Sequence, residues 1–241
     1  MTRRRFFAPP SAFDSSKRTV TLTADEARHL REVLRLKPGD EVSVFDGAGK
    51  EFRARVAQAR RESAELDVDE EIEPARPESP LQITLAVALL KGEKFDLVVQ
   101  KATELGVTKI VPLITRYADI KLRDESDASK RVARWQRIAL EAAKQSGRAV
   151  VPEVTLPKSF ASVFKNPCLL FSEKGGHGLT QIDTDSVTAI VGSEGGWSDE
   201  ELEQARTAGA QIVTLGGRIL RAETAAITVA ALLQHRFGDL K

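Results

Sequence analysis

The sequence has little of the chemistry that builds disulfides, metal centres and membrane spans. Its one cysteine, Cys168, has no second thiol to pair with and lies in the apolar run 168–171, where we expect an inert core side chain. The histidines His29, His177 and His235 lack metal-site spacing. No apolar run approaches the ~18 residues of a membrane span, and the basic start lacks the apolar core of a secretory signal. We therefore expect a cytoplasmic protein with no metal and no membrane contact.

The common nucleotide-binding fingerprints are also missing. No stretch reads G-x-G-x-x-G or G-x-x-x-x-G-K-[ST]. With 36 Lys and Arg against 35 Asp and Glu, the average charge gives only weak support for a nucleic-acid partner. A length of 241 residues, a hydrophobic fraction of 41% and a charged fraction of 29% are typical of one or two ordinary globular domains.

Basic residues are nevertheless concentrated in the first part of the chain, whereas the only charged residues in 62–73 are acids. Arg53 and Arg55 share one face of the alternating segment 52–56, and a predicted helix carries three more arginines. Two interpretations stay open: a phosphate-binding surface, or a solvated face with salt bridges, which is the usual outcome for charge runs. The candidate RNA contacts are Arg4, Arg5, Arg28, Arg31, Arg35, Arg53 and Arg55.

Residues 1–72 have the pattern of short strands around one helix. Thr23 and Glu26 have the spacing of a capping box for a helix through Leu36, and the segments 42–45, 52–57 and 66–68 alternate with period two. Closely spaced short strands suggest a small barrel. Residues 73–80 follow with three prolines, which is typical of a stiff linker at a domain boundary.

Residues 81–241 alternate between buried strands and helices. Apolar runs at 81–90, 107–114 and 168–171 are separated by helical patterns at 95–105 and about 130–145, and Gly106 has the C′ position of the first helix. Residues 115–129 have the composition of an exposed, charged loop. This alternation predicts an α/β domain whose parallel sheet is covered on both faces.

Two glycine-rich loops follow strand-like runs at 187–191 and 211–215. The first, Gly192-Ser193-Glu194-Gly195-Gly196, precedes a helix start at Ser198, with Glu201 placed for a capping box. The second, LGGRILRAETA at 215–225, leads into the apolar helix 225–233. One such loop would be an ordinary turn, but two at one sheet edge favour a ligand site. An acidic Glu194 would repel phosphate and favours a cationic or zwitterionic ligand.

These loops and their spacing resemble the SPOUT methyltransferases, in particular the RsmE family of 16S ribosomal RNA (uracil-N3)-methyltransferases. Further blocks resemble that family in its order: RRFF at 4–7, HLREVLRLKPGD at 29–40, KGEKFD at 91–96, QKATELGV at 100–107 and WQRIALEAAKQSGR at 135–148. Two positions depart from the family pattern. Ser193 stands where proline is more frequent, and Gly217 where a bulkier residue or proline is common.

The resemblance implies a PUA-like, RNA-binding β-barrel at 1–72, a linker at 73–80, and a trefoil-knotted SPOUT methyltransferase domain at 81–241. It also implies S-adenosylmethionine as cofactor, held by loops that follow Phe171, Val191 and Leu215. The implied cofactor-binding residues are Phe171, Gly192, Ser193, Glu194, Gly195, Gly196, Leu215, Gly216, Gly217, Ile219 and Leu220. Methylation would occur at uracil N3, giving the 3-methyluridine of the decoding region of 16S rRNA in the assembled small subunit.

Three residues are candidates for catalysis. Methyl transfer to uracil N3 needs the two reactants in line and a route for the N3 proton. Arg221 is a candidate to stabilise the uracil anion. Glu223 is the nearest candidate base, and the alternative role for Glu223 is to orient Arg221. Glu194 is suited to the cationic end of the cofactor or to a nearby arginine. The alternative for Arg221 and Glu223 is a surface ion pair of little energetic weight.

The nearly all-round apolar helix 225–233 predicts a homodimer. Three alternatives for function stay open: a non-catalytic RNA-binding or ribosome-assembly protein, an α/β enzyme that binds another nucleotide-like ligand, and a SPOUT methyltransferase with a different RNA target.

Overall fold

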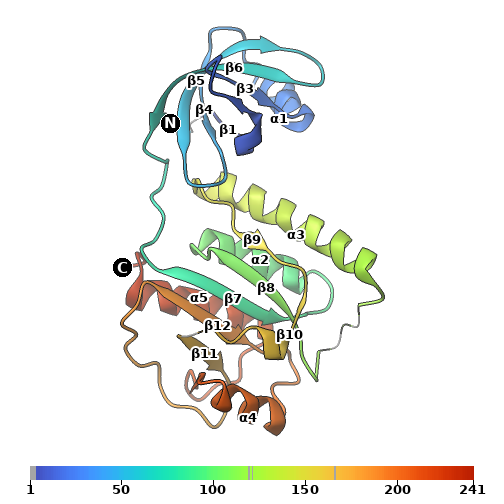
Figure 1. Ribbon diagram of the computed structural model, residues 1–241, viewed down its shortest axis with the longest axis vertical. Coiled ribbons are helices and arrows are strands. Elements are labelled where there is room, and N and C mark those ends of the chain that lie inside the picture. The colour runs from blue at the N-terminus through green and yellow to red at the C-terminus, as the bar shows by residue number, and fades with distance from the viewer. Residues whose placement is uncertain (1–3, 119, 121, 166) are drawn as a thin grey trace. The chain divides into compact units, whose positions relative to one another are not determined.

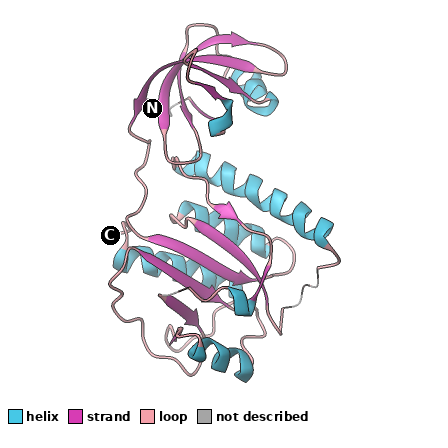
Figure 2. Cartoon of the chain, in the orientation of Figure 1, coloured by secondary structure: helices cyan, strands magenta, loops and turns pink. Residues whose placement is uncertain are grey.

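The computed structural model describes residues 4–118, 120, 122–165 and 167–241. The chain forms two compact units (Figure 1). The first comprises Met1–Glu78 and Ala143–Val151, and the second comprises Ser79–Ala142 and Pro152–Lys241. Figure 2 distinguishes the helices and strands of each unit. No helix within the described ranges is long and apolar enough to cross a membrane.

The first unit is built on one curled, six-stranded sheet with the strand order β1-β4-β5-β6-β3-β2. Its β1 pairs with β4 in parallel, and every other neighbouring pair is antiparallel. The expected strands at 42–45, 52–57 and 66–68 are all present, with longer bounds. The strands are β1 (Arg5–Phe7), β2 (Phe13–Asp14), β3 (Thr19–Leu22), β4 (Glu41–Phe45), β5 (Glu51–Ala59) and β6 (Ala64–Ile72), with a 3-10 turn η1 at Pro10–Ala12.

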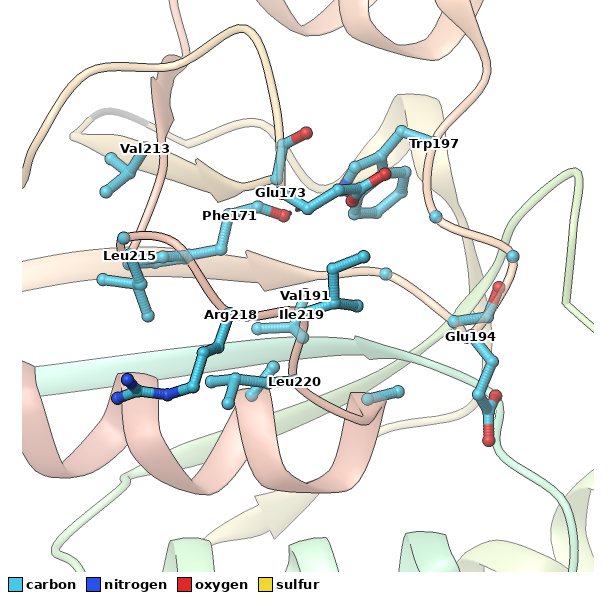
Figure 3. Close-up of a pocket in the computed structure, with 18 residues that line it drawn as sticks. Phe171, Glu173, Val191, Glu194, Trp197, Val213, Leu215, Arg218, Ile219 and Leu220 are labelled. Carbon is cyan, nitrogen blue, oxygen red and sulfur yellow. Dashed lines mark hydrogen bonds between the residues drawn. The ribbon is translucent and has the colours of Figure 1, made fainter.

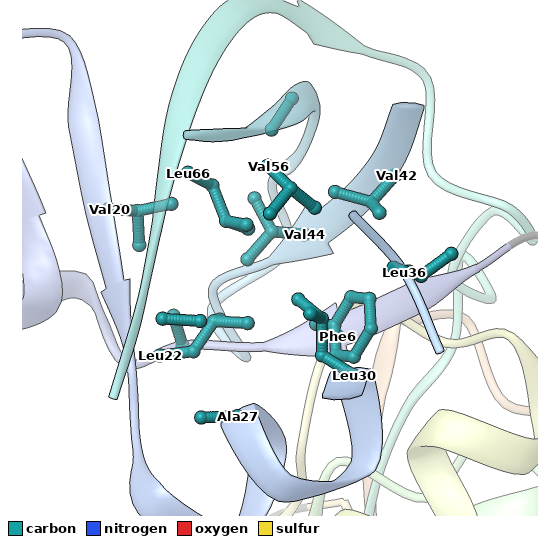
Figure 4. Packing of buried hydrophobic residues seen from close by; sticks show 13 residues of the cluster. Phe6, Val20, Leu22, Ala27, Leu30, Leu36, Val42, Val44, Val56 and Leu66 are labelled. Carbon is teal, nitrogen blue, oxygen red and sulfur yellow. The ribbon is translucent and has the colours of Figure 1, made fainter. Parts of the chain in front are cut away.

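Alternation along these strands gives the first unit its core. Phe6, Val44 and Leu66 come from three different strands, and each is fully buried. Leu30 packs against them from the helical segment (Figure 4). Because successive side chains of a strand point to opposite faces, Glu65 and Asp67 on either side of Leu66 are exposed on the outer face of the sheet.

The helix of the first unit differs from the sequence-based prediction. It runs as α1 (Ala24–Arg28) and then as a single π-helical turn, η2 (His29–Val33), so it ends before Leu36. The capping box expected of Thr23 and Glu26 does not form, because Thr23 makes no side-chain cap bond. Glu26 is buried instead, and its Oε1 accepts a 2.6 Å hydrogen bond from Lys144 Nζ. The buried ion pair takes the carboxylate that would have reached back to the helix start.

The second unit contains the predicted α/β fold, with a seven-stranded sheet that is parallel throughout. The path β10-β8-β7-β12-β11-β13 runs across it, and β9 pairs beside β8. The strands are β7 (Gln82–Ala88), β8 (Lys109–Ile114), β9 (Glu153–Val154), β10 (Lys158–Ser159), β11 (Cys168–Phe171), β12 (Ser186–Val191) and β13 (Gln211–Val213). The helices are α2 (Lys94–Glu104), α3 (Glu125–Ser146, whose residues 143–146 belong to the first unit), α4 (Asp199–Thr207) and α5 (Ala222–Phe237), with a 3-10 turn η3 at Phe160–Ser162.

Helices cover both faces of this sheet, as expected of parallel strands. Helices α2 and α5 lie against each other, with α5 on β7 and β12. On the opposite face, Leu202 of α4 packs with Leu170 and Ile190 of the sheet. Gly106 follows α2 with a φ of 78°, so the predicted C′ glycine is confirmed.

Two helix boundaries were predicted too short. The long helix α3 begins at Glu125 and not near residue 130. The loop expected at 115–129 therefore ends five residues earlier than predicted, at Asp124. Asp124 marks the true start, because its Oδ1 accepts a 2.8 Å bond from the Asp127 amide in the manner of an N-cap. The last helix, α5, starts at Ala222 and so includes Glu223 in its first turn, with Arg221 at the N-cap position.

Candidate functional site

The candidate site forms where three neighbouring strands of the second unit end together. Phe171 at the end of β11 is level with Val191 of β12 and with Val213 of β13. The loops that leave these three strands therefore start from one edge of the sheet. In open parallel sheets, the carboxyl ends of the strands are where ligands bind.

A pocket of about 230 Å³ opens among these loops (Figure 3). It is bordered by the ends of β11, β12 and β13, by the first glycine loop and by the start of α5. The lining residues are Phe171, Ser172, Glu173, Val191, Gly192, Ser193, Glu194, Gly195, Gly196, Trp197, Val213, Leu215, Gly216, Arg218, Ile219, Leu220, Ala222 and Ala225.

Ten of the eleven residues expected to bind the cofactor line this pocket. The exception is Gly217, which does not border it. Ile219 is 86% exposed, a high value for an apolar side chain beside a cavity. Of the three candidate catalytic residues, Glu194 lines the pocket, whereas Arg221 and Glu223 lie just beyond its lining at the start of α5.

The sequence did not predict several wall residues, of which Ser172, Glu173, Trp197 and Arg218 are polar or aromatic. Trp197 and Arg218 each stand directly beside a glycine pair, and that adjacency was the available signal. Trp197 is 6% exposed, and its Nε1 donates a 2.9 Å bond to the Phe171 carbonyl. A Cβ on Gly192 would come within 3.0 Å of this indole ring, so glycine is needed there for close packing.

The first glycine loop is held from outside by Tyr117. Ser193 Oγ donates a 3.0 Å bond to the Tyr117 carbonyl, and a Cβ on Gly195 would lie only 2.7 Å from Tyr117 Cβ. The Gly196 amide bonds the Ser193 carbonyl at 3.0 Å, and Gly196 has a φ of 68°. The tight turn therefore accounts for Gly196, and the close approach of Tyr117 accounts for Gly195.

The helix after this loop starts at the predicted capping box. Ser198 Oγ accepts a 3.2 Å bond from the Glu201 amide, and Glu201 Oε2 accepts a 3.0 Å bond from the Ser198 amide. Glu201 Oε1 also accepts a 2.9 Å bond from the Arg116 amide. The box therefore fixes both the entry of α4 and the segment that carries Tyr117.

Four charged groups gather beside the pocket. Lys94, the first residue of α2, donates a hydrogen bond to Glu194 Oε1, and its Nζ lies 3.8 Å from Glu223 Oε2. The hydrogen bond with Glu194 raises the pKa of Lys94, the charges of Glu194 and Glu223 add to this effect, and burial and the charge of Arg221 oppose it. Lys94 was not among the predicted site residues.

The candidate RNA-binding arginines of the first unit lie on its surface, with the exception of Arg5. Ion pairs link Arg4 to Asp40, Arg28 and Arg31 to Glu32, Arg53 to Glu70 and Glu41, and Arg55 to Asp69 and Glu41. Arg35 has a φ of 53°, an uncommon value for a residue with a side chain. The surface therefore alternates basic and acidic groups.

Arg5 belongs to the interior of the first unit. Its side chain is 7% exposed, its Nε lies 3.2 Å from Glu51 Oε2, and its guanidinium stacks 3.9 Å over the Phe45 ring. It also donates a 2.8 Å bond to the Arg148 carbonyl. A guanidinium held in this way is unavailable as a surface phosphate contact.

Comparison with known proteins assigns both parts of the chain. Residues 77–234 match the RNA methyltransferase domain family, and residues 22–69 match the RNA methyltransferase PUA domain family. The chain is 36% identical over 237 residues to the ribosomal RNA small subunit methyltransferase E of Synechocystis, covering 93% of this chain and 75% of that protein.

Two solved structures are similar along nearly their whole length. The ribosomal RNA small subunit methyltransferase E of Neisseria gonorrhoeae, bound to S-adenosyl methionine, has a TM-score of 0.88 and 36% identity, with 99% of this chain and 100% of that chain covered. A Legionella pneumophila methyltransferase in complex with the bound cofactor SAM has a TM-score of 0.89 and 32% identity, with both chains fully covered. These matches show that the chain belongs to the RsmE family of ribosomal RNA small subunit methyltransferases.

Proposed function

We propose that this chain transfers the methyl group of S-adenosylmethionine to N3 of one uridine in 16S rRNA, on the assembled small ribosomal subunit. The observation that carries the proposal is the pocket enclosed by three strand-end loops in a member of the RsmE family. Two similar structures hold this same cofactor. The position on uracil and the subunit substrate rest on the family resemblance.

The pocket suits S-adenosylmethionine, which supplies a methyl group on a cationic sulfur. Gly216 has a φ of 93°, and a Cβ there would meet nothing within 4 Å, so this part of the wall is bare backbone beside open space. Glu173 and Glu194 bring carboxylates to a wall that would face a cation. Arg218 brings a guanidinium, the group best matched to the carboxylate of the methionine part.

We assign removal of the N3 proton, and stabilisation of the resulting charge, to residues at the start of α5. Glu223 is 13% exposed, and its Oε2 is buried without a hydrogen-bond partner in the described part of the chain. Such an oxygen is suited to receive the N3 proton. Arg221 is exposed at the N-cap position, where its charge can stabilise the uracil anion. The N3 atom is on the pairing edge of uracil, so the target base must be unpaired or flipped.

We propose that the barrel at 1–72 binds RNA and that residues 81–241 transfer the methyl group, with 73–80 as the linker. We also propose a homodimer, since Leu232 of the apolar helix α5 is 37% exposed. A molecular mass in solution equal to that of one chain, measured at micromolar concentration, would contradict the dimer. The trefoil knot implied by the family resemblance, and a cytoplasmic location beside the ribosome, stay predictions.

The test is single-turnover transfer from labelled S-adenosylmethionine to small subunits that lack the modification, with the product nucleoside identified. We expect 3-methyluridine. A product methylated at carbon 5 or on the ribose would refute the reaction. Calorimetry with S-adenosylmethionine, ATP and NAD distinguishes the alternatives. A ribosome-assembly protein would bind RNA but no methyl donor. An α/β enzyme of another kind would bind ATP or NAD more tightly than S-adenosylmethionine.

A further inference from the structure

Lys94 joins three segments that are distant in sequence. It begins α2, Glu194 belongs to the loop after β12, and Glu223 belongs to the first turn of α5. Its ammonium contacts Glu194 Oε1 and lies 3.8 Å from Glu223 Oε2. One cation therefore serves two carboxylates, at the point where the pocket meets the proposed catalytic residues.

This arrangement has an electrostatic consequence. Two carboxylates held close together repel, and one of them takes up a proton unless a cation lies between them. Lys94 supplies that cation. The positive charge of Arg221 also acts on Lys94 and lowers its pKa, but less than the hydrogen bond with Glu194 raises it.

The other charged residues of α2 are engaged elsewhere. Asp96, one half-turn on from Lys94, accepts hydrogen bonds from Arg134 and from Trp135 Nε1, and therefore faces α3. Lys101, two turns on, bonds both carboxylate oxygens of Glu104 at 2.9 Å. Of the two basic residues of α2, Lys94 therefore faces the edge of the pocket, whereas Lys101 pairs with Glu104 of the same segment.

We propose that Lys94 is a positioning residue, which keeps Glu194 and Glu223 ionised and in place so that Glu223 accepts the proton of the acceptor base. This inference rests on the proposed function. In the step, a bond forms between N3 and the methyl carbon while the bond between that carbon and sulfur breaks. The electron pair of the broken bond stays on sulfur, which becomes neutral, and the N3 proton moves to the Glu223 carboxylate.

The test compares the pH dependence of single-turnover methylation in the Lys94→Met variant and in the wild type. Without the ammonium, a carboxylate of the pair should keep its proton to higher pH, so we expect the acidic limb of the rate profile to move up by about one pH unit or more. Above that limb, the rate should return to within a few-fold of the wild-type rate. Lys94→Arg restores a cation and should return the limb towards its original position.

Two further variants keep the test decisive. Lys101→Met makes the same change two turns along α2, and its profile should match that of the wild type. Glu223→Gln removes the proposed proton acceptor, so adding Lys94→Met to it should cause no further displacement of the limb. Circular dichroism and calorimetry with S-adenosylmethionine check that each variant is folded and binds the cofactor.

The outcomes separate this inference from the proposed function. If the wild type makes 3-methyluridine and Lys94→Met lowers the rate equally at every pH, the positioning role is wrong and Lys94 is only structural. If Lys94→Met does not fold, the acidic limbs of the wild type, Lys94→Arg and Glu223→Gln are compared instead. Equal acidic limbs in these three proteins would overturn the inference. If the wild type makes no 3-methyluridine, the proposed function itself fails.

Discussion

Trp197 and Phe171 connect two of the three loops that enclose the pocket, through a 2.9 Å hydrogen bond from the indole Nε1 to the backbone carbonyl. The indole also packs against Phe160, with ring centroids 5.0 Å apart, and it limits Gly192 to a residue without a side chain. The tryptophan therefore sets the distance between the β11 loop and the first glycine loop.

Replacing Trp197 by Phe should weaken cofactor binding and lower the free energy of unfolding by about 1 to 3 kcal/mol, because a buried carbonyl loses its donor. Trp135→Phe is the matched control. It also removes an indole donor, which bonds Asp96 at 3.0 Å, at a position that does not line the pocket. Urea denaturation and calorimetry should show loss of stability in both variants and loss of affinity in Trp197→Phe alone. Equal affinities would contradict the wall role of Trp197.

Gly216 and Gly39 offer a second matched pair. Their φ angles are 93° and 91°, and a Cβ at either position would meet nothing within 4 Å. Alanine should therefore cost roughly 1 to 2 kcal/mol of stability at each, from backbone strain alone. Only Gly216 lines the pocket, so only Gly216→Ala should raise the Kd for S-adenosylmethionine, by roughly tenfold, or ~1.4 kcal/mol. An unchanged Kd would show that this loop does not hold the cofactor.

Arg53 and Arg55 test the RNA-binding role of the first unit. Both are about half exposed and paired with acids of neighbouring strands, so glutamine is a cleaner replacement than glutamate, which would place like charges across the sheet. If they bind phosphates, the double variant should bind rRNA more weakly, and its salt dependence should lose about one unit of slope per arginine. Affinity for S-adenosylmethionine should not change.

Lys109→Gln is the control for this experiment, because Lys109 is a surface cation of the second unit paired with Glu153 at 2.7 Å. Equal salt slopes in the wild type and the double arginine variant would mean that Arg53 and Arg55 only pair with their acidic neighbours. An equal loss of RNA and cofactor affinity would refute the division of labour between the units.

Arg221→Ala should reduce the single-turnover methylation rate by roughly 10² to 10³, the usual effect of losing a donor that acts on charge in the transition state. Cofactor affinity should hardly change, because Arg221 does not line the pocket. Calorimetry and transfer to small subunits measure the two effects separately. A wild-type rate would refute the assigned role, and a large loss of cofactor affinity would reassign Arg221 to binding.

Cys168 should make stability fall at high pH. Burial raises the pKa of its thiol from 9.0 to about 11. Because the folded-state pKa lies above the unfolded one, this contribution is fully present below pH 9 and is lost as pH rises through 11. We expect a loss of up to about 3 kcal/mol across that window. Denaturation of the wild type and Cys168→Ala should diverge there, and parallel curves would contradict a buried, protonated thiol.

The features that the sequence predicted correctly are those controlled by neighbouring residues. The alternating apolar runs placed β7, β8, β11 and β12 in a parallel sheet, and Ser198 with Glu201 marked the start of α4. Each depends on side-chain periodicity or on a hydrogen bond over three residues. Asp124 carried the same kind of signal for α3, and the charge of the surrounding segment masked it.

The features that the sequence left undecided depend on partners far along the chain. Thr23 and Glu26 have capping-box spacing, yet the carboxylate of Glu26 bonds Lys144, 118 positions away. Arg5 and Arg4 are neighbours of the same type, but only Arg5 is buried against Glu51. A charge in the interior needs an opposite charge beside it, and where that charge lies depends on the path of the chain.

The sequence by itself determined seven strands (β4 to β8, β11 and β12), the start of α4, the two glycine loops and the family. Only the tertiary structure decided that Trp197 bonds Phe171 and that Lys94 bonds Glu194, 100 positions away. The physical reason is range: hydrophobic periodicity and capping act within a few residues, whereas a pocket wall or an ion pair forms between residues that only the folded sheet brings within hydrogen-bond distance.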